Sequence, residues 1–196
     1  MRFVFLLAPL FLGAYWAVTQ AADAPSGEVT GKLVAGPSRL QSEFGPTLTG
    51  EALDAYREWS RAPEHFGAFA ATDYGEYGWV SAYNTIEAAE IGALGYCGVP
   101  DCKVFARTFP LRRANDGELV VSLRTATAFA EFLTLPNSKA FAVHGNGAGG
   151  SWINAGSLPS AVTGALKECD RKSRMTDSDI PLSDGIEGCR IVHAEW

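Results

Sequence analysis

Three histidines, His65, His144 and His193, are the side chains of this 196-residue chain best suited to acid–base or metal chemistry near neutral pH. His144 and His193 both fall in expected strands of the C-terminal half, so a sheet could bring them together as an acid–base or metal-binding pair. Solvated or hydrogen-bonded histidines are the simpler interpretation, because the N-terminal half has Thr72 and Ala106, or residues near them, at the corresponding places. We keep His144 and His193 as candidate binding residues.

Two further segments look like known sites only in part. Residues 145–150, Gly-Asn-Gly-Ala-Gly-Gly, lack the Lys-Ser/Thr ending of a phosphate-binding loop, and a hairpin turn explains them. Asp177, Asp179 and Asp184 lack the ordered spacing and closing glutamate of a calcium loop. No Gly-x-Ser-x-Gly elbow occurs either. We therefore assign no catalytic residue, cofactor or metal, and the sequence leans against an enzyme.

Aromatic residues gather around the expected hairpins. Trp79 and Trp152 are accompanied by Tyr74, Tyr77 and Tyr83. The structural interpretation is that most of them pack between sheet and helix. The functional alternative is an exposed patch that binds a protein or a glycan, because Trp and Tyr often anchor interfaces. Asn84 comes just before an expected helix and is interpreted as shaping that turn.

The elements that must position these residues form one motif that occurs twice in the sequence. Residues 68–97 and 140–169 share ten of thirty positions at a constant offset of 72, without gaps. The two tryptophans, however, are 73 apart. Since a slip of one residue turns a strand side chain to the other face, we expect a one-residue insertion in the second hairpin and a compensating loss later.

Each copy reads as helix, strand, strand, helix, strand. Apolar residues at helical spacing surround Tyr56 and Phe129, and Thr85 and Ser157 stand where a helix N-cap belongs. The expected ranges are strands 66–72, 103–108, 140–144 and 190–195 and helices 86–96 and 158–168. The fold class is therefore α+β, a tandem duplication of this unit with an antiparallel sheet covered by helices and with two disulfides. We expect the two copies to form one compact body, because a single copy buries little core.

The repeat and the N-terminal pattern described next divide the chain into five expected segments. These are a signal peptide (1–21), a flexible N-terminal segment (22–48), the first repeat (49–108), a connector (109–121) and the second repeat (122–196).

The N-terminal 21 residues predict export. Arg2 precedes an apolar run from Phe3 to Val18, and small residues follow at the expected cut after Ala21. A membrane anchor is the alternative, but the run is short and is broken by proline and glycine. Without this segment, 15 basic residues stand against 22 acidic ones, which argues against nucleic acid and anionic membranes as partners. We expect a periplasmic or secreted protein without stable membrane insertion.

Four cysteines in an exported chain indicate two disulfides. Cys97 and Cys102 follow the second helix of the first copy, and Cys169 and Cys189 occupy the same two places in the second copy. This equivalence selects the pairs Cys97–Cys102 and Cys169–Cys189. A zinc site is the competing interpretation, although the spacings match no familiar zinc pattern.

Phe66-Gly-Ala-Phe-Ala, the later Tyr-Gly-Trp, an alanine-rich helix and the Cys…Cys-x-Val pair resemble a family of small secreted bacterial domains of unknown function. The resemblance covers residues 55–108 and 128–196. It implies turns, caps, helices and disulfides, and it brings no catalytic residue. Some relatives carry a 5-aminolevulinate synthase label, which this chain does not support, because it is too short for a pyridoxal-phosphate fold.

These observations predict a non-enzymatic binding module of the bacterial envelope or secreted space, whose partner is another protein. Two alternatives stay open. One is an envelope enzyme with an unrecognised site in the second repeat, and the other is a small-ligand or glycan binder that uses the hairpin aromatics.

Overall fold

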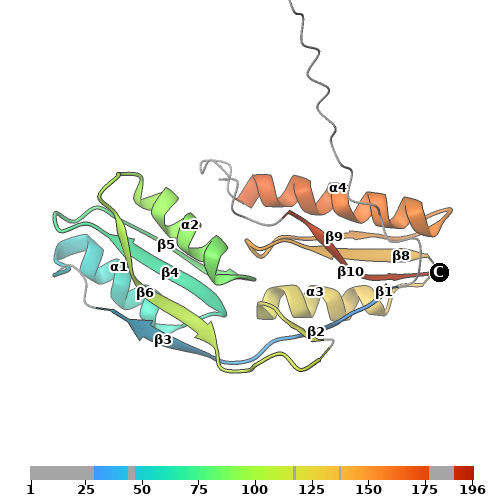
Figure 1. Ribbon diagram of the computed structural model, residues 1–196, viewed down its shortest axis with the longest axis horizontal. Coiled ribbons are helices and arrows are strands. Elements are labelled where there is room, and N and C mark those ends of the chain that lie inside the picture. The colour runs from blue at the N-terminus through green and yellow to red at the C-terminus, as the bar shows by residue number, and fades with distance from the viewer. Residues whose placement is uncertain (1–28, 44–46, 117, 137, 177–187) are drawn as a thin grey trace, which may run out of the picture.

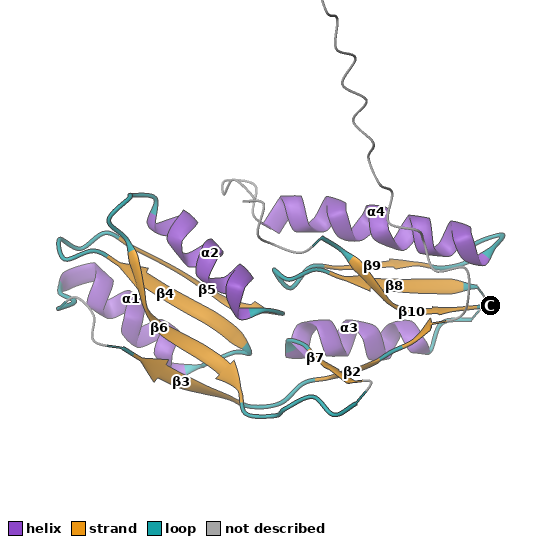
Figure 2. Cartoon of the chain, viewed as in Figure 1, coloured by secondary structure: helices purple, strands orange, loops and turns teal. Residues whose placement is uncertain are grey.

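The computed structural model describes residues 29–43, 47–116, 118–136, 138–176 and 188–196. These residues form an α+β structure with helices on antiparallel sheets, as predicted (Figures 1 and 2). The elements in chain order are β1 (Val29–Thr30), β2 (Lys32–Val34), β3 (Ser38–Ser42), α1 (Gly50–Arg61), β4 (Phe66–Ala71), β5 (Tyr77–Tyr83), α2 (Ile86–Cys97), β6 (Lys103–Pro110), β7 (Glu118–Val120), α3 (Leu123–Leu133), β8 (Lys139–Val143), β9 (Gly149–Trp152), α4 (Leu158–Thr176) and β10 (Arg190–Glu195). The predicted signal peptide, residues 1–21, lies outside the described residues.

Each half of the molecule is a sheet between two helices. The first sheet has the strand order β3-β6-β4-β5, and the second has β1-β10-β8-β9. In the first, α2 packs on the face that carries Ala68 and Ala70, and α1 packs on the face that carries Phe69. In the second, α4 and α3 cover the two faces in the same way (Figure 2). Each four-stranded sheet thus has its own core clusters, one on each face.

The same order of elements appears in both halves, and a close backbone contact recurs in each. A Cβ on Gly78 would collide with the backbone of α2 at Ala93 and next to Cys97. A Cβ on Gly150 would collide with α4 at Ala165 and Cys169. Glycine is therefore required wherever the helix lies directly on the second hairpin strand. Descent of the two halves from one duplicated unit stays a prediction.

The segment predicted as flexible, residues 22–48, contains three strands between residues 29 and 42. β1 pairs with β10 at the edge of the second sheet, β2 pairs in parallel with β7, and β3 pairs with β6 at the edge of the first sheet. These strands were not predicted, because they are short and mostly exposed and because their partners lie far away in sequence. Residues 29–42 thereby connect the two halves (Figure 1).

Helix α4 continues to Thr176, beyond the expected end at residue 168. Its counterpart α2 ends at Cys97 because Gly98 follows in the left-handed conformation, with φ of 74°, and its N–H caps the carbonyl of Leu94. Asp170 stands at the corresponding place in α4, so no glycine stops the helix. Leu94, near the end of α2, is exposed.

The two halves meet at Asn84, which does more than shape a turn. Its Nδ2 donates to the carbonyl of His144 over 2.9 Å, and its Oδ1 accepts from the N–H of Ser122 over 3.1 Å. The backbone N–H of Asn84 donates to the carbonyl of Gly145 over 2.7 Å. Because Asn84 is buried, these bonds hold the base of the first hairpin against the turn of the second.

Candidate functional site

Both predicted disulfides are present. Cys97 pairs with Cys102 and Cys169 with Cys189, with Cα–Cα distances of 6.3 and 6.0 Å. Each bridge joins the end or middle of a helix to the start of the next strand. All four cysteines are used, so none is left as a thiolate for the zinc site considered above.

His144 is buried at the end of β8 and serves the hairpin turn. Its Nδ1 lies 2.7 Å from Oδ1 of Asn146, and the N–H of Asn146 donates to the same ring nitrogen over 3.2 Å. Asn146 in turn donates from Nδ2 to the carbonyl of Ser173 in α4, over 3.0 Å. These bonds fix the turn against α4.

His193 lies in β10 among apolar rings. It contacts Phe129 and Phe132 of α3 edge to face. Its Nε2 lies 3.2 Å from Oε2 of Glu195. Since α3 and α4 cover opposite faces of the sheet, the structure does not bring His193 together with His144, and no observation favours an acid–base pair.

Trp79 and Trp152 are not equivalent, and the predicted insertion is absent. Phe69 pairs with Trp79 across the first hairpin, whereas the matching Phe141 pairs with Ser151. The offset of 72 is thus kept through the turn, and Trp152 lies one residue further along its strand. The two tryptophans therefore face opposite sides of their sheets.

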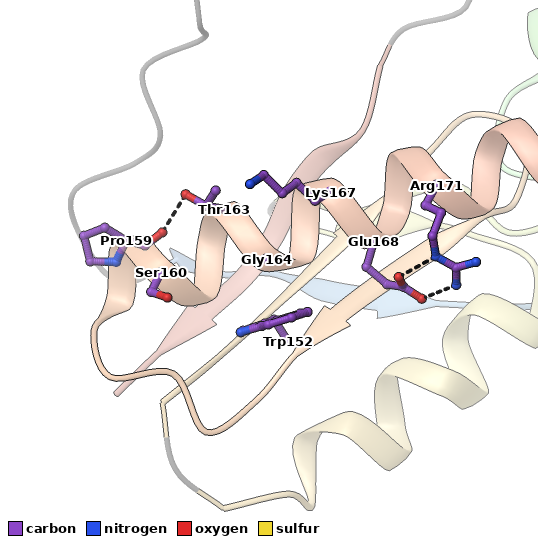
Figure 3. Close-up of a pocket in the computed structure, with 8 residues that line it drawn as sticks. All are labelled: Trp152, Pro159, Ser160, Thr163, Gly164, Lys167, Glu168 and Arg171. Carbon is purple, nitrogen blue, oxygen red and sulfur yellow. Dashed lines mark hydrogen bonds and ion pairs between the residues drawn. The ribbon is translucent and has the colours of Figure 1, made fainter.

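Both tryptophan side chains are partly exposed, Trp79 by 39% and Trp152 by 47%. They do not form one aromatic surface, because they belong to different sheets and different faces. Trp152 lies in a groove between β9 and α4 (Figure 3).

The groove at Trp152 has a volume of about 550 Å³. Figure 3 shows the indole ring below α4, next to Gly164, where a Cβ would collide with the ring. The remaining lining comes from α4 and consists of Pro159, Ser160, Thr163, Lys167, Glu168 and Arg171. The groove thus has an aromatic floor and a polar, charged rim.

An ion pair borders the groove. Arg171 donates from Nε and Nη2 to the two carboxylate oxygens of Glu168, over 2.8 and 2.7 Å. This two-point pairing lowers the pKa of Glu168, so the carboxylate stays ionised near neutral pH. Lys167 adds a second positive charge, so the three ionisable side chains of the groove carry a net positive charge in an acidic protein.

A second, larger cleft of about 830 Å³ lies on the α3 side of β9 and reaches the junction of the halves. Gly149 and Ser151 of β9 line it, together with Ser81 and its neighbours from β5. Leu135, which is 38% exposed and lies two residues after α3, provides apolar surface, and the end of α4 closes the cleft with Arg171 and neighbouring residues. The two cavities therefore flank the same strand.

Several of these lining residues were missed from the sequence. Glu168 and Arg171 are three residues apart on a helix, and this spacing predicts an ion pair. It does not predict that the pair borders the same groove as Trp152. Only the folded structure shows that Trp152 lies over Gly164. Asp177, Asp179 and Asp184 lie outside the described residues. Among the residues that the structure describes, no cluster of three or more potential metal ligands occurs.

Searches against family models, curated proteins and solved structures find no match to this chain.

Proposed function

We propose that this protein is an exported binding module, stapled by two disulfides, which binds another protein of the envelope or the secreted space through the groove at Trp152. The observation that carries the proposal is the indole of Trp152, 47% exposed on the floor of a groove with a charged rim. A large apolar ring surrounded by polar groups is the usual anatomy of an interface hot spot.

The compartment rests on the disulfides. Two bridges with no free cysteine fit an oxidising environment. Residues 1–21 then act as a cleaved signal peptide, and residues 22–196 form the mature protein. Within the part of the chain that the structure describes, no helix is both long and apolar enough to cross a membrane.

The rigidity of the groove supports binding. The indole is seated on Gly164, and β9 is held to α4 by the close approach at Gly150. The disulfide at Cys169 lies on α4 between the groove residues Glu168 and Arg171. A groove built from a strand, a helix and a disulfide loses little conformational entropy when a partner binds.

The test is capture of a partner from envelope extract by the mature, oxidised protein, with Trp152→Ala as the site variant. Trp79→Ala is the matched control, since Trp79 is similarly exposed on the other half. We expect reproducible capture by wild type and by Trp79→Ala, and loss of it by Trp152→Ala. Equal capture by all three proteins would contradict the assignment to this groove, and no reproducible partner would count against the binding function itself.

A further inference from the structure

Strand β9 lies at an open edge of its sheet. In the order β1-β10-β8-β9, it pairs only with β8 among the described strands. The N–H of His144 donates to the carbonyl of Ala148 over 2.9 Å, which sets the alternation of this antiparallel ladder. The backbone groups of Gly150 and Trp152 then point toward β8, and those of Ser151 and Ile153 point outward.

The edge is short, but it lacks several of the other features that usually prevent pairing with another strand. Residues 149–153, Gly-Gly-Ser-Trp-Ile, contain no lysine and no proline, and the register between β8 and β9 has no bulge. Ser151, Trp152 and Ile153 are all exposed. The outward N–H and C=O groups of Ser151 and Ile153 are therefore in position to pair with an extended chain.

A cavity lies on each side of this edge. Trp152 opens onto the groove beneath α4, while Ser151 opens onto the cleft beside α3. Successive side chains of a strand point to opposite faces, so a strand added next to β9 would place alternate side chains in the two cavities.

We propose that β9 is the docking edge for an extended peptide segment of the partner protein, which adds to the second sheet as a further strand. This inference rests on the proposed function and specifies how the partner is held. The main chain of the peptide pairs with Ser151 and Ile153. Its alternate side chains are apolar toward Leu135, which lines the same cleft as Ser151, and acidic toward Lys167 and Arg171.

The surroundings of β9 favour a single extended segment over a second copy of this protein. β9 lies between α3 and α4, which cover the two faces of its sheet (Figure 1). The comparable free edge, β5, is flanked by its own helices, α1 and α2. If β9 paired with a free edge of a second copy, the helices that flank the two edges would collide. A single extended chain can reach β9 without such a collision.

The probe is a short fluorescent peptide in which valine or phenylalanine alternates with glutamate, and binding is measured by anisotropy. The control peptide has the same composition with apolar and acidic residues in separate blocks. Two further peptides carry N-methyl groups on one or the other alternate set of amides. A strand pairs through one set only, so one methylated isomer should bind at least about tenfold more weakly and the other should bind like the parent peptide.

The matched protein variants are Ser151→Pro and Ser151→Ala. Proline removes the outward N–H without removing a bond to β8, so binding should weaken by about tenfold or more. Alanine keeps the N–H and should change binding by less than about twofold. Nuclear magnetic resonance should also show slowed solvent exchange of the Ser151 and Ile153 amides on peptide addition. If Ser151→Pro does not fold, the methylated peptides and the exchange measurement on wild type decide the question.

Three results would overturn the inference. The first is equal binding of both methylated isomers, and the second is capture of the envelope partner that depends on Trp152 but is unchanged in Ser151→Pro. The second result leaves the proposed binding function intact, so the two failures are distinguishable. The third is a wild-type dimer in sedimentation that Ser151→Pro dissociates, which would assign the edge to a second copy of the chain.

Discussion

At the scale of single residues, two basic side chains are buried, and the sequence around them did not predict that burial. His65 precedes β4 and is 3% exposed, with a positive φ of 46°. Lys139 opens β8 and is also 3% exposed. Both lie where the chain turns between elements, and each has consequences for stability that can be measured.

His65 should make the protein sensitive to mild acid. Burial lowers the pKa of His65 to about 4, although a hydrogen bond with the backbone of Val120 opposes the shift. Between pH 6.5 and about 4 the unfolded chain therefore binds a proton that the folded chain excludes, and the free energy of unfolding falls as the pH is lowered. The loss attributable to this group is at most about 3 kcal/mol and is absent above this window.

The measurement is urea unfolding at several pH values, with His65→Asn as the comparison. Asparagine does not titrate, and it tolerates positive φ better than most residues. The difference between the two proteins should change from pH 7 toward pH 4 and then level off. Parallel stability curves for wild type and variant would show that His65 is not the titrating group.

Lys139 should contribute through hydrogen bonds to a helix end. Its Nζ donates to the carbonyls of Leu133 and Leu135 over 2.9 and 2.6 Å and pairs with Glu195 over 2.9 Å. Lys139→Met leaves these oxygens without their donor, and we expect a loss of about 3 kcal/mol in chemical unfolding. Glu195→Gln should cost about 1 kcal/mol or less, because that carboxylate is partly exposed. If Lys139→Met and Glu195→Gln lowered the free energy of unfolding equally, the hydrogen bonds to the two carbonyls would not be the main contribution of Lys139.

At the scale of elements, the decisive contacts are those between helices and hairpin strands. Gly78 and Gly150 let α2 and α4 lie directly on the backbone of β5 and β9. Small residues on the helices, such as Ala93 and Ala165, complete the approach, and both are fully buried. The close contact explains why these positions carry glycine and alanine in both halves.

Gly150→Ala should therefore destabilise the second half by about 2 kcal/mol or more, because its Cβ meets the backbone of α4 and not a movable side chain. Gly156→Ala is the matched control, since nothing lies within 4 Å of its Cβ and its φ is not positive. Thermal unfolding followed by circular dichroism measures both variants. A Gly150→Ala protein as stable as the control would show that the helix can move away without cost.

At the scale of the whole molecule, the halves are joined by the strap of residues 29–42 and by the buried bonds of Asn84. Asn84→Ala removes the donor to the His144 carbonyl and the acceptor for Ser122 N–H. We expect a loss of about 2 kcal/mol and a broader unfolding transition, as the halves become less coupled. Asn115→Ala, which removes only an exposed side-chain bond, should leave the transition unchanged. A sharp, single transition in Asn84→Ala at the wild-type midpoint would show that the strap alone couples the halves.

The sequence by itself determined the local elements and their order. Turn glycines, the caps Thr85 and Ser157 and the equivalent cysteines act over a few residues, so their patterns are readable without the fold. Thr85 and Ser157 do cap α2 and α4, since each side chain accepts from the N–H three residues on. The disulfide pairs were also predicted correctly, because the repeat limited the choice among connectivities.

The tertiary structure alone decided how distant residues meet. The strands in residues 29–42 exist only through partners far along the chain, and the opposite facing of the tryptophans depends on strand register. The groove combines one side chain of β9 with residues of α4, and the junction joins Asn84 to a turn 60 residues away. Such contacts depend on which elements pack together, and the periodic spacing of apolar residues shows that an element is packed but not against which partner.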